Sequence, residues 1–176
     1  MVEIDMGFSK SESSGLLAPD RKQITNEDIA LMFGDNYREL VEAKVRKLGI
    51  LGRLNFFDTP IPHDGSQAVY LVEQFEGDDL ILVPVLQKGM KTSQHHHVEP
   101  MRKESYFHIA GESVVHVGTE ENPQPLNDIH PVREIPLGLI HQVRAPTGPA
   151  LTLIIMEKAR LVPPGQLHIK HTKQLV

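Results

Sequence analysis

The chain of 176 residues has no cysteine and no tryptophan, and aromatic residues make up only 5% of it. Without cysteine, neither a disulfide framework nor a thiolate metal site can form. The longest apolar runs, "LILVPVL" (80–86) and "LTLIIM" (151–156), are too short to span a bilayer as helices. The first residues, "MVEIDMGFSKSESSG", lack the basic segment and apolar core of a secretory signal. These absences predict a cytoplasmic protein with no membrane partner.

Negative side chains outnumber positive ones, and the formal net charge is -5 at pH 7. No basic stripe is present that could neutralise the phosphates of a nucleic acid, so we expect no nucleic-acid partner. Hydrophobic residues make up 40% of the chain, which is enough for one domain with a buried core.

The N-terminal part divides into a polar segment and a helical one. Residues 1–22 are rich in Ser, Lys and Glu and are predicted to form a disordered tail. Thr25 and Asp28 have the spacing of a capping box, and apolar residues then recur at helical intervals. Gly34 is expected to interrupt this pattern. Residues 23–49 are therefore predicted as an N-terminal helical segment.

From residue 50 onward the pattern changes to short strand-like runs. Segments such as "AVYLVEQF", "ESYFHIAG" and "LTLIIMEK" are separated by Gly, Pro, Asp and Asn. Many short strands with frequent turn residues indicate an all-β antiparallel sandwich or barrel. We predict this barrel over residues 50–160, followed by a C-terminal arm over 161–176.

The segment "QHHHVEPMRKESYFHIAG" (94–111) holds three consecutive histidines and, further on, a glutamate. Residues two apart in a strand point to the same face, so His95 and His97 can converge while His96 faces away. Glu104 can add a carboxylate, and His141 follows a Pro-x-Gly turn. Three imidazoles and one carboxylate suit a divalent transition metal such as Fe, Mn, Ni, Zn or Co, and not Ca or Mg.

Less specific explanations exist for each of these residues. A single strand histidine is more often a surface or packing residue than a ligand, and a histidine run can be compositional or a purification tag. A tag is disfavoured, because this run lies in mid-chain between ordinary segments. The joint arrangement of the residues decides for a metal site.

Two segments resemble the paired motifs of the cupin superfamily. The first is "GMKTSQHHHVEPMRKESYFHIAG" (89–111), with Gly, five residues, His-x-His, a gap, Glu, six residues and Gly. The second is "PLGLIH" (136–141), which matches Pro-x-Gly-x-x-His. Both occur in the family's order. The resemblance covers about residues 53–158.

The resemblance implies a small double-stranded antiparallel β-barrel, or jelly roll, with one divalent metal held by His95, His97, Glu104 and His141. It also implies a homodimer. The gap of six residues between His97 and Glu104 exceeds the family's usual three or four, which predicts a longer hairpin, "VEPMRK" (98–103), at the mouth of the site. Glu99 is the alternative carboxylate ligand.

Four further residues are candidates for contact with a substrate. If Glu104 points inward, strand alternation sends Tyr106 and His108 inward as well, where they could act as catalytic groups. The alternative is that Tyr106 is a core residue and His108 an interior filler. Arg102 and Lys103, placed on the hairpin, could bind an anionic substrate or could simply be solvated.

Three functions remain open for such a site. The first is a metal-dependent isomerase or epimerase of a sugar or related polyhydroxy compound, favoured by the polar candidates above. The second is a non-haem iron dioxygenase, for which the same four ligands serve equally well. The third is a non-catalytic protein that binds a metal or a small ligand.

Overall fold

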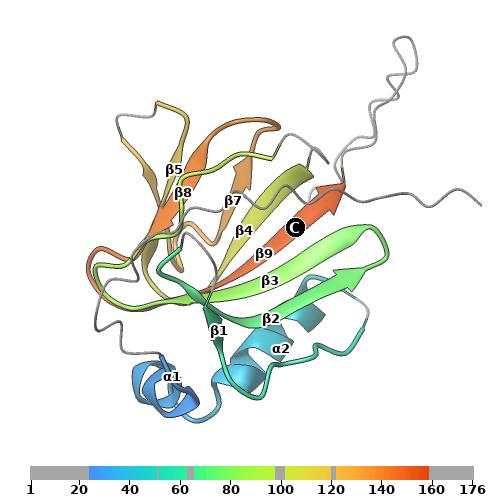
Figure 1. Cartoon of the computed structure of the whole chain (residues 1–176), viewed down its shortest axis with the longest axis vertical. Coiled ribbons are helices and arrows are strands. Elements are labelled where there is room, and N and C mark those ends of the chain that lie inside the picture. The colour runs from blue at the N-terminus through green and yellow to red at the C-terminus, as the bar shows by residue number, and fades with distance from the viewer. Residues whose placement is uncertain (1–23, 51, 63–65, 98–101, 120–121, 159–176) are drawn as a thin grey trace, which may run out of the picture.

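The computed structural model describes residues 24–50, 52–62, 66–97, 102–119 and 122–158. The predicted tail (1–22) and arm (161–176) lie outside these residues, as does the alternative ligand Glu99. Figure 1 shows two helices on one side of a large twisted sheet, with a smaller sheet facing its other side.

Two helices form where the helical segment was predicted: α1 (Asn26–Phe33) and α2 (Tyr37–Lys47). The predicted capping box is present, because the Thr25 hydroxyl accepts from the Asp28 backbone N–H and the Asp28 carboxylate accepts from the Thr25 backbone N–H. Gly34 ends α1 at a φ of 90°, which favours glycine. The interruption of the helical pattern at this glycine is therefore confirmed.

The strands form two antiparallel sheets. The large one has the order β1-β2-β3-β9-β4-β7 and the small one the order β6-β5-β8. The bounds in the large sheet are β1 (Ile61–Pro62), β2 (Val69–Glu76), β3 (Asp79–Leu86), β9 (Ala150–Lys158), β4 (Arg102–Gly111) and β7 (Val132–Ile135). Those in the small sheet are β6 (Gln124–Leu126), β5 (Ser113–Val117) and β8 (His141–Arg144).

The segment from Lys91 to His95 continues the small sheet beyond β8. Isolated bridges pair Lys91 with Arg144 and His95 with His141. The predicted all-β fold of antiparallel sheets behind an N-terminal helical segment is confirmed. Within the residues that the structure describes, the two sheets face each other without pairing into one closed barrel.

The large sheet separates two apolar layers. Strand alternation on β9 sends Leu151 and Leu153 toward the helices and Ile154 and Met156 toward the small sheet. The helix-side layer is closed by the buried helical residues, such as Val41. The layer between the sheets is the interior that contains the predicted site.

Candidate metal centre

Four side chains predicted as ligands come together at one end of the layer between the sheets. One ligand atom from each of His95, His97, Glu104 and His141 lies within 4.8 Å of all the others. His141 is the first residue of β8, and Glu104 lies on β4 across the interior. The four residues come from both sheets, so only the folded chain assembles them.

The backbone fixes two of the histidines side by side. The His141 N–H donates to the His95 carbonyl at 2.9 Å, and the His95 N–H donates to the His141 carbonyl at 3.2 Å. Gly138, with a φ of 74°, allows the turn in which the Leu139 N–H donates to the Pro136 carbonyl just before His141. This is the physical reason for the glycine in "PLGLIH".

A second glycine of the motifs is required by close packing. Gly111 ends β4 at a φ of 77°, and a Cβ atom at this position would lie 2.0 Å from the Pro149 carbonyl oxygen. Any other residue would therefore displace the turn before β9. The spacing from Glu104 to Gly111 thus reflects the length of β4 between the site and this contact.

In His95 and His141, the hydrogen bond made by Nδ1 determines whether Nε2 carries a proton. His95 Nδ1 lies 3.0 Å from the Ser93 carbonyl oxygen, and His141 Nδ1 lies 3.0 Å from the Leu139 carbonyl oxygen. A carbonyl only accepts, so each Nδ1 carries the proton. In a neutral imidazole, Nε2 then presents a lone pair, which is the form that binds a metal.

The Glu104 carboxylate faces the Nε2 atoms of the cluster. Its Oε1 lies 2.5 Å from His97 Nε2 and 3.1 Å from His141 Nε2, and its side chain is 1% exposed. None of these three buried atoms has a hydrogen bond of good geometry. Acceptor atoms that converge in this way need protons on the rings or a cation among them. Three nitrogens and one oxygen therefore fit a divalent transition metal.

The electrostatics favour the ionised form of the carboxylate. Burial by itself would raise the pKa of Glu104, but in the metal-free cluster the close contacts and positive charge of the His141 and His97 rings outweigh it and lower the pKa to about 2. Burial lowers the pKa of His95. In His141, burial acts in the same direction, but the contact with Glu104 outweighs it and raises the pKa. The carboxylate is thus ionised, as a metal ligand must be.

Tyr106 binds the second oxygen of the same carboxylate. Its hydroxyl donates to Glu104 Oε2 at 2.9 Å, and the residue is 2% exposed. Burial, and then the charge of Glu104, raise the pKa of Tyr106 well above 10, so the hydroxyl keeps its proton and remains a donor. Tyr106 therefore orients Glu104 and leaves Oε1 directed at the histidines.

Tyr70 is a residue near the site that the sequence did not indicate. It is buried in the layer between the sheets. Burial, then the charges of Glu73 and Glu104, raise its pKa to about 12. Alternation with Ala68 could have placed Tyr70 inward, but nothing in the sequence of β2 connects it with the histidines.

His108 lies away from the cluster. It is four residues beyond Glu104 on β4, which corresponds to about 13 Å along a strand. Its Nε2 donates to the Gly111 carbonyl at 2.8 Å, and its Nδ1 lies 3.3 Å from Asp128 Oδ1. Its ring thus bridges the end of β4 and the loop that contains Asp128.

The two predicted cationic residues are the first two residues of β4. Arg102 donates from Nη1 to the Asp78 and Met156 carbonyls at 3.0 and 3.2 Å. Lys103 Nζ lies 3.1 Å from Glu134 Oε1. The ladder with β9 already begins at Arg102, and the rest of the predicted hairpin, 98–101, lies outside the described residues. Both cations are bound to protein groups.

No family model matches this chain, and no curated protein matches it. Several solved structures are similar to it. A Cupin 2 conserved barrel domain protein from Salinispora arenicola is 16% identical, with 62% of this chain and 91% of that one covered and a TM-score of 0.48. An RmlC-like cupin with a double-stranded β-helix fold from Methanocaldococcus jannaschii is 14% identical, with 62% and 92% covered and a TM-score of 0.48.

A structure of the DMSP lyases RdDddP and RnDddQII is also similar, at 14% identity, with 77% of this chain and 95% of that one covered and a TM-score of 0.48. Cupin-2 and RmlC-like cupin proteins are thus among the structures that this chain resembles, as its two motifs predicted. In the described part of the chain, no helix has the length and apolar character needed to cross a membrane.

Proposed function

We propose that this protein is a metal-dependent enzyme for a small substrate, with one divalent transition metal held by His95, His97, Glu104 and His141. The observation that carries the proposal is the convergence of Nε2 atoms on the ionised Glu104 Oε1 without well-directed hydrogen bonds. A bound cation satisfies all of these acceptors at once, whereas the empty cluster leaves them unsatisfied in a buried position.

When bound, such a metal supplies Lewis-acid chemistry, and iron in addition supplies reactivity toward dioxygen. The chain's own residues prepare the site. Ser93 and Leu139 hold a proton on Nδ1 of His95 and His141, so that the Nε2 lone pairs stay available. The Tyr106 hydroxyl donates its proton in a hydrogen bond to Glu104 Oε2 and so fixes the orientation of the carboxylate. These contacts preorganise the ligand set.

The surroundings favour an oxygenase over a sugar isomerase. The isomerase proposal rested on Arg102, Lys103, Tyr106 and His108, and of these only Tyr106 contacts the cluster. A polyhydroxy substrate needs many hydrogen-bond partners, because each unpaired hydroxyl costs about 1–3 kcal/mol when buried. An apolar cluster fills part of the layer between the sheets and includes Leu82, Val117, Val143, Ile154 and Met156.

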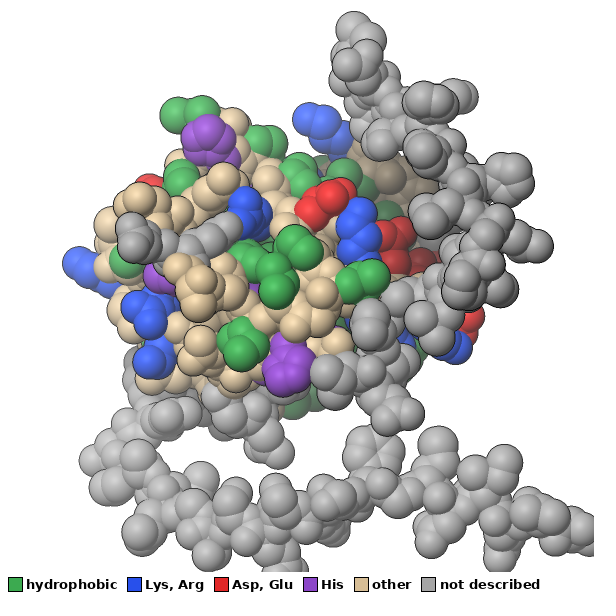
Figure 2. All heavy atoms as spheres, turned by 90° about the horizontal axis from the view of Figure 1, so that it is seen from above, with side chains coloured by type: hydrophobic (Ala, Val, Ile, Leu, Met, Phe, Trp, Pro, Cys, Tyr) green, Lys and Arg blue, Asp and Glu red, His purple; other side chains and the backbone are tan. Residues whose placement is uncertain are grey.

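The loop before His141 is also apolar. Leu137, Leu139 and Ile140 are 49%, 43% and 43% exposed. Figure 2, which looks down on the top of the molecule in Figure 1, shows hydrophobic side chains gathered near the middle of that face. A metal cluster next to an apolar cluster and an apolar loop suits a small, largely apolar substrate and dioxygen. We therefore propose a non-haem iron dioxygenase, with the isomerase as the alternative.

The identity of the metal and the need for oxygen distinguish these functions. Protein purified without added ions is analysed for metal content and then tested in an oxygen electrode against diketones, thiols and small aromatic compounds. We expect about one iron per chain and oxygen uptake that depends on the substrate. Mn, Co, Ni or Zn together with anaerobic conversion of an aldose or ketose would establish the isomerase instead.

The third function, metal or ligand binding without catalysis, predicts that fully loaded protein converts no member of a broad panel. This panel adds sugars, phosphosugars and DMSP to the compounds above. The matched variants are His95→Ala, which removes a proposed ligand, and His96→Ala, which removes the exposed histidine next to it. Metal content that is equal in the two variants would refute the metal site itself.

We also propose that the protein is a homodimer. β7 is an edge strand of the large sheet, and its Val132 is 47% exposed, while Ile129 in the preceding loop is 81% exposed. An edge strand with exposed apolar side chains is stabilised by pairing with another chain. The same edge of a second copy supplies a self-complementary surface.

A further inference from the structure

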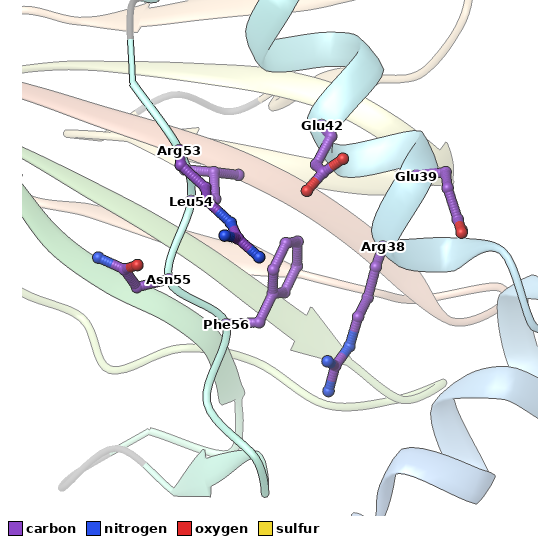
Figure 3. Close-up of a pocket in the computed structure, with 7 residues that line it drawn as sticks. All are labelled: Arg38, Glu39, Glu42, Arg53, Leu54, Asn55 and Phe56. Carbon is purple, nitrogen blue, oxygen red and sulfur yellow. The ribbon is translucent and has the colours of Figure 1, made fainter.

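A hollow of about 420 Å³ lies between α2 and the segment 53–56, on the helix side of the large sheet. Figure 3 shows Arg38, Glu39 and Glu42 reaching from α2 and Arg53 to Phe56 from the opposite wall. No residue of the metal cluster lines it. Its volume is in the range of small-ligand sites, about 300–1,000 Å³.

Arg38 is fixed at one side of this hollow. Its Nε donates to the Tyr37 hydroxyl at 3.3 Å and its Nη2 to the Phe57 carbonyl at 3.4 Å. Its Cζ lies 5.3 Å from the centroid of the Phe56 ring, a cation–π distance. Two of its five N–H groups are used in these bonds, so the others remain for a ligand.

Arg53 faces the same ring from the other side. Figure 3 shows its guanidinium beside the Phe56 ring, on the side away from Arg38. Its backbone carbonyl accepts from Gln74, but among the described residues its side chain has no hydrogen bond or ion pair. The Glu42 carboxylate lies 3.6 Å from Arg46 Nη1, so it is already paired with another cation. The hollow thus contains a guanidinium group that has no partner in the part of the chain that the structure describes.

Apolar surface adjoins this charge. Leu54 is buried and Phe56 is half-buried in the wall of the hollow. A guanidinium group binds a planar carboxylate or a phosphate through paired N–H donors, and an aromatic side chain adds affinity for an apolar group. Both recognition elements are present within one hollow.

We propose that this hollow is a second, non-metal binding site for a small organic anion that combines an oxyanion with an apolar group. The oxyanion, a carboxylate or a phosphate, binds the guanidinium of Arg53, and the apolar group packs on Phe56 and Leu54. The N–H groups of Arg38 that remain are donors for a further oxygen of the ligand. The site is independent of the metal and of the proposed reaction.

Isothermal titration of the full chain with five probes tests both recognition elements. Benzoate and phenyl phosphate carry the oxyanion and the apolar group, acetate and inorganic phosphate carry the oxyanion only, and benzyl alcohol carries the apolar group only. We expect saturable binding of benzoate, phenyl phosphate or both, at least about tenfold tighter than that of the other three. The preferred member of the pair identifies the oxyanion.

Two variants locate the binding. Arg53→Ala should weaken the preferred probe by at least about tenfold, since it removes the paired donors. Lys88→Ala removes an exposed cation that does not line the hollow and should leave affinity unchanged. Circular dichroism verifies that both variants are folded. Absence of saturable binding to wild-type protein, equal binding of benzyl alcohol, or full affinity in Arg53→Ala would overturn the proposal.

Discussion

Replacement of Tyr106 by phenylalanine tests how the fold holds the carboxylate of the metal centre. The change removes only the hydroxyl that donates to Glu104 Oε2 at 2.9 Å, and both residues are fully buried. A hydrogen bond to a charged group contributes about 1.5–3 kcal/mol, and loss of the donor leaves a buried carboxylate oxygen unsatisfied. We expect the free energy of unfolding of the metal-free protein to fall by about 2 kcal/mol.

The same change should weaken metal binding. Tyr106 orients Glu104, and loss of a residue that orients a ligand typically costs about 10–100-fold in metal affinity. Urea denaturation of metal-free protein measures the first effect, and titration against a competing chelator measures the second. In a thermal scan, the loss of about 2 kcal/mol corresponds to a decrease in Tm of about 4–8 °C for a chain of this size.

Tyr37→Phe is the matched control. Tyr37 is also buried, and its hydroxyl donates to Asn26 Oδ1 at 3.0 Å on the helix side of the large sheet. This variant should lose about 1 kcal/mol of stability, because the hydroxyl donates to a neutral amide and accepts a longer bond, 3.3 Å, from Arg38 Nε, and it should bind metal as the wild type does. The proposed positioning role of Tyr106 would be wrong if Tyr106→Phe kept full metal affinity. It would also be wrong if Tyr37→Phe lost as much metal affinity as Tyr106→Phe.

Three further predictions concern the metal ligands, the pH dependence of stability and the oligomeric state. His141→Ala should reduce metal content to a small fraction of the wild-type value, whereas His96→Ala should keep about one metal per chain, as measured by elemental analysis. In metal-free protein, the pKa of Glu104 is lowered from 4.5 to about 2. Ionised Glu104 therefore stabilises the folded state by about 3 kcal/mol above pH 4.5, and this contribution is lost as the pH falls toward 2. Urea titrations across this range should show that loss in the wild type and not in Glu104→Gln; equal pH dependence would contradict it. Light scattering should give the mass of a dimer at micromolar concentration, and a monomer mass would rule out the proposed pairing at β7.

The local structure of the N-terminal part could be predicted from the sequence. The capping box at Thr25 and Asp28 and the break at Gly34 depend on contacts within a few residues, so short-range spacing was sufficient. The same holds for the turn at Gly138, where a positive φ before His141 follows from local backbone geometry. The resemblance of two segments to the cupin motifs added the prediction that residues far apart in the sequence lie together, which local spacing does not show.

The sequence by itself determined which residues could form a metal site, because alternation and motif spacing selected the three histidines and Glu104. Only the tertiary structure decided what surrounds them. It places Tyr106 on Glu104, brings Tyr70 near that carboxylate, and directs Arg102 and His108 to other groups. Side-chain partners depend on which strands face each other, and the residues that pair between β4 and β9 lie far apart in the sequence, as Arg102 and Lys158 do. That pairing begins at Arg102, two residues before Glu104, and so places both predicted cations in a strand.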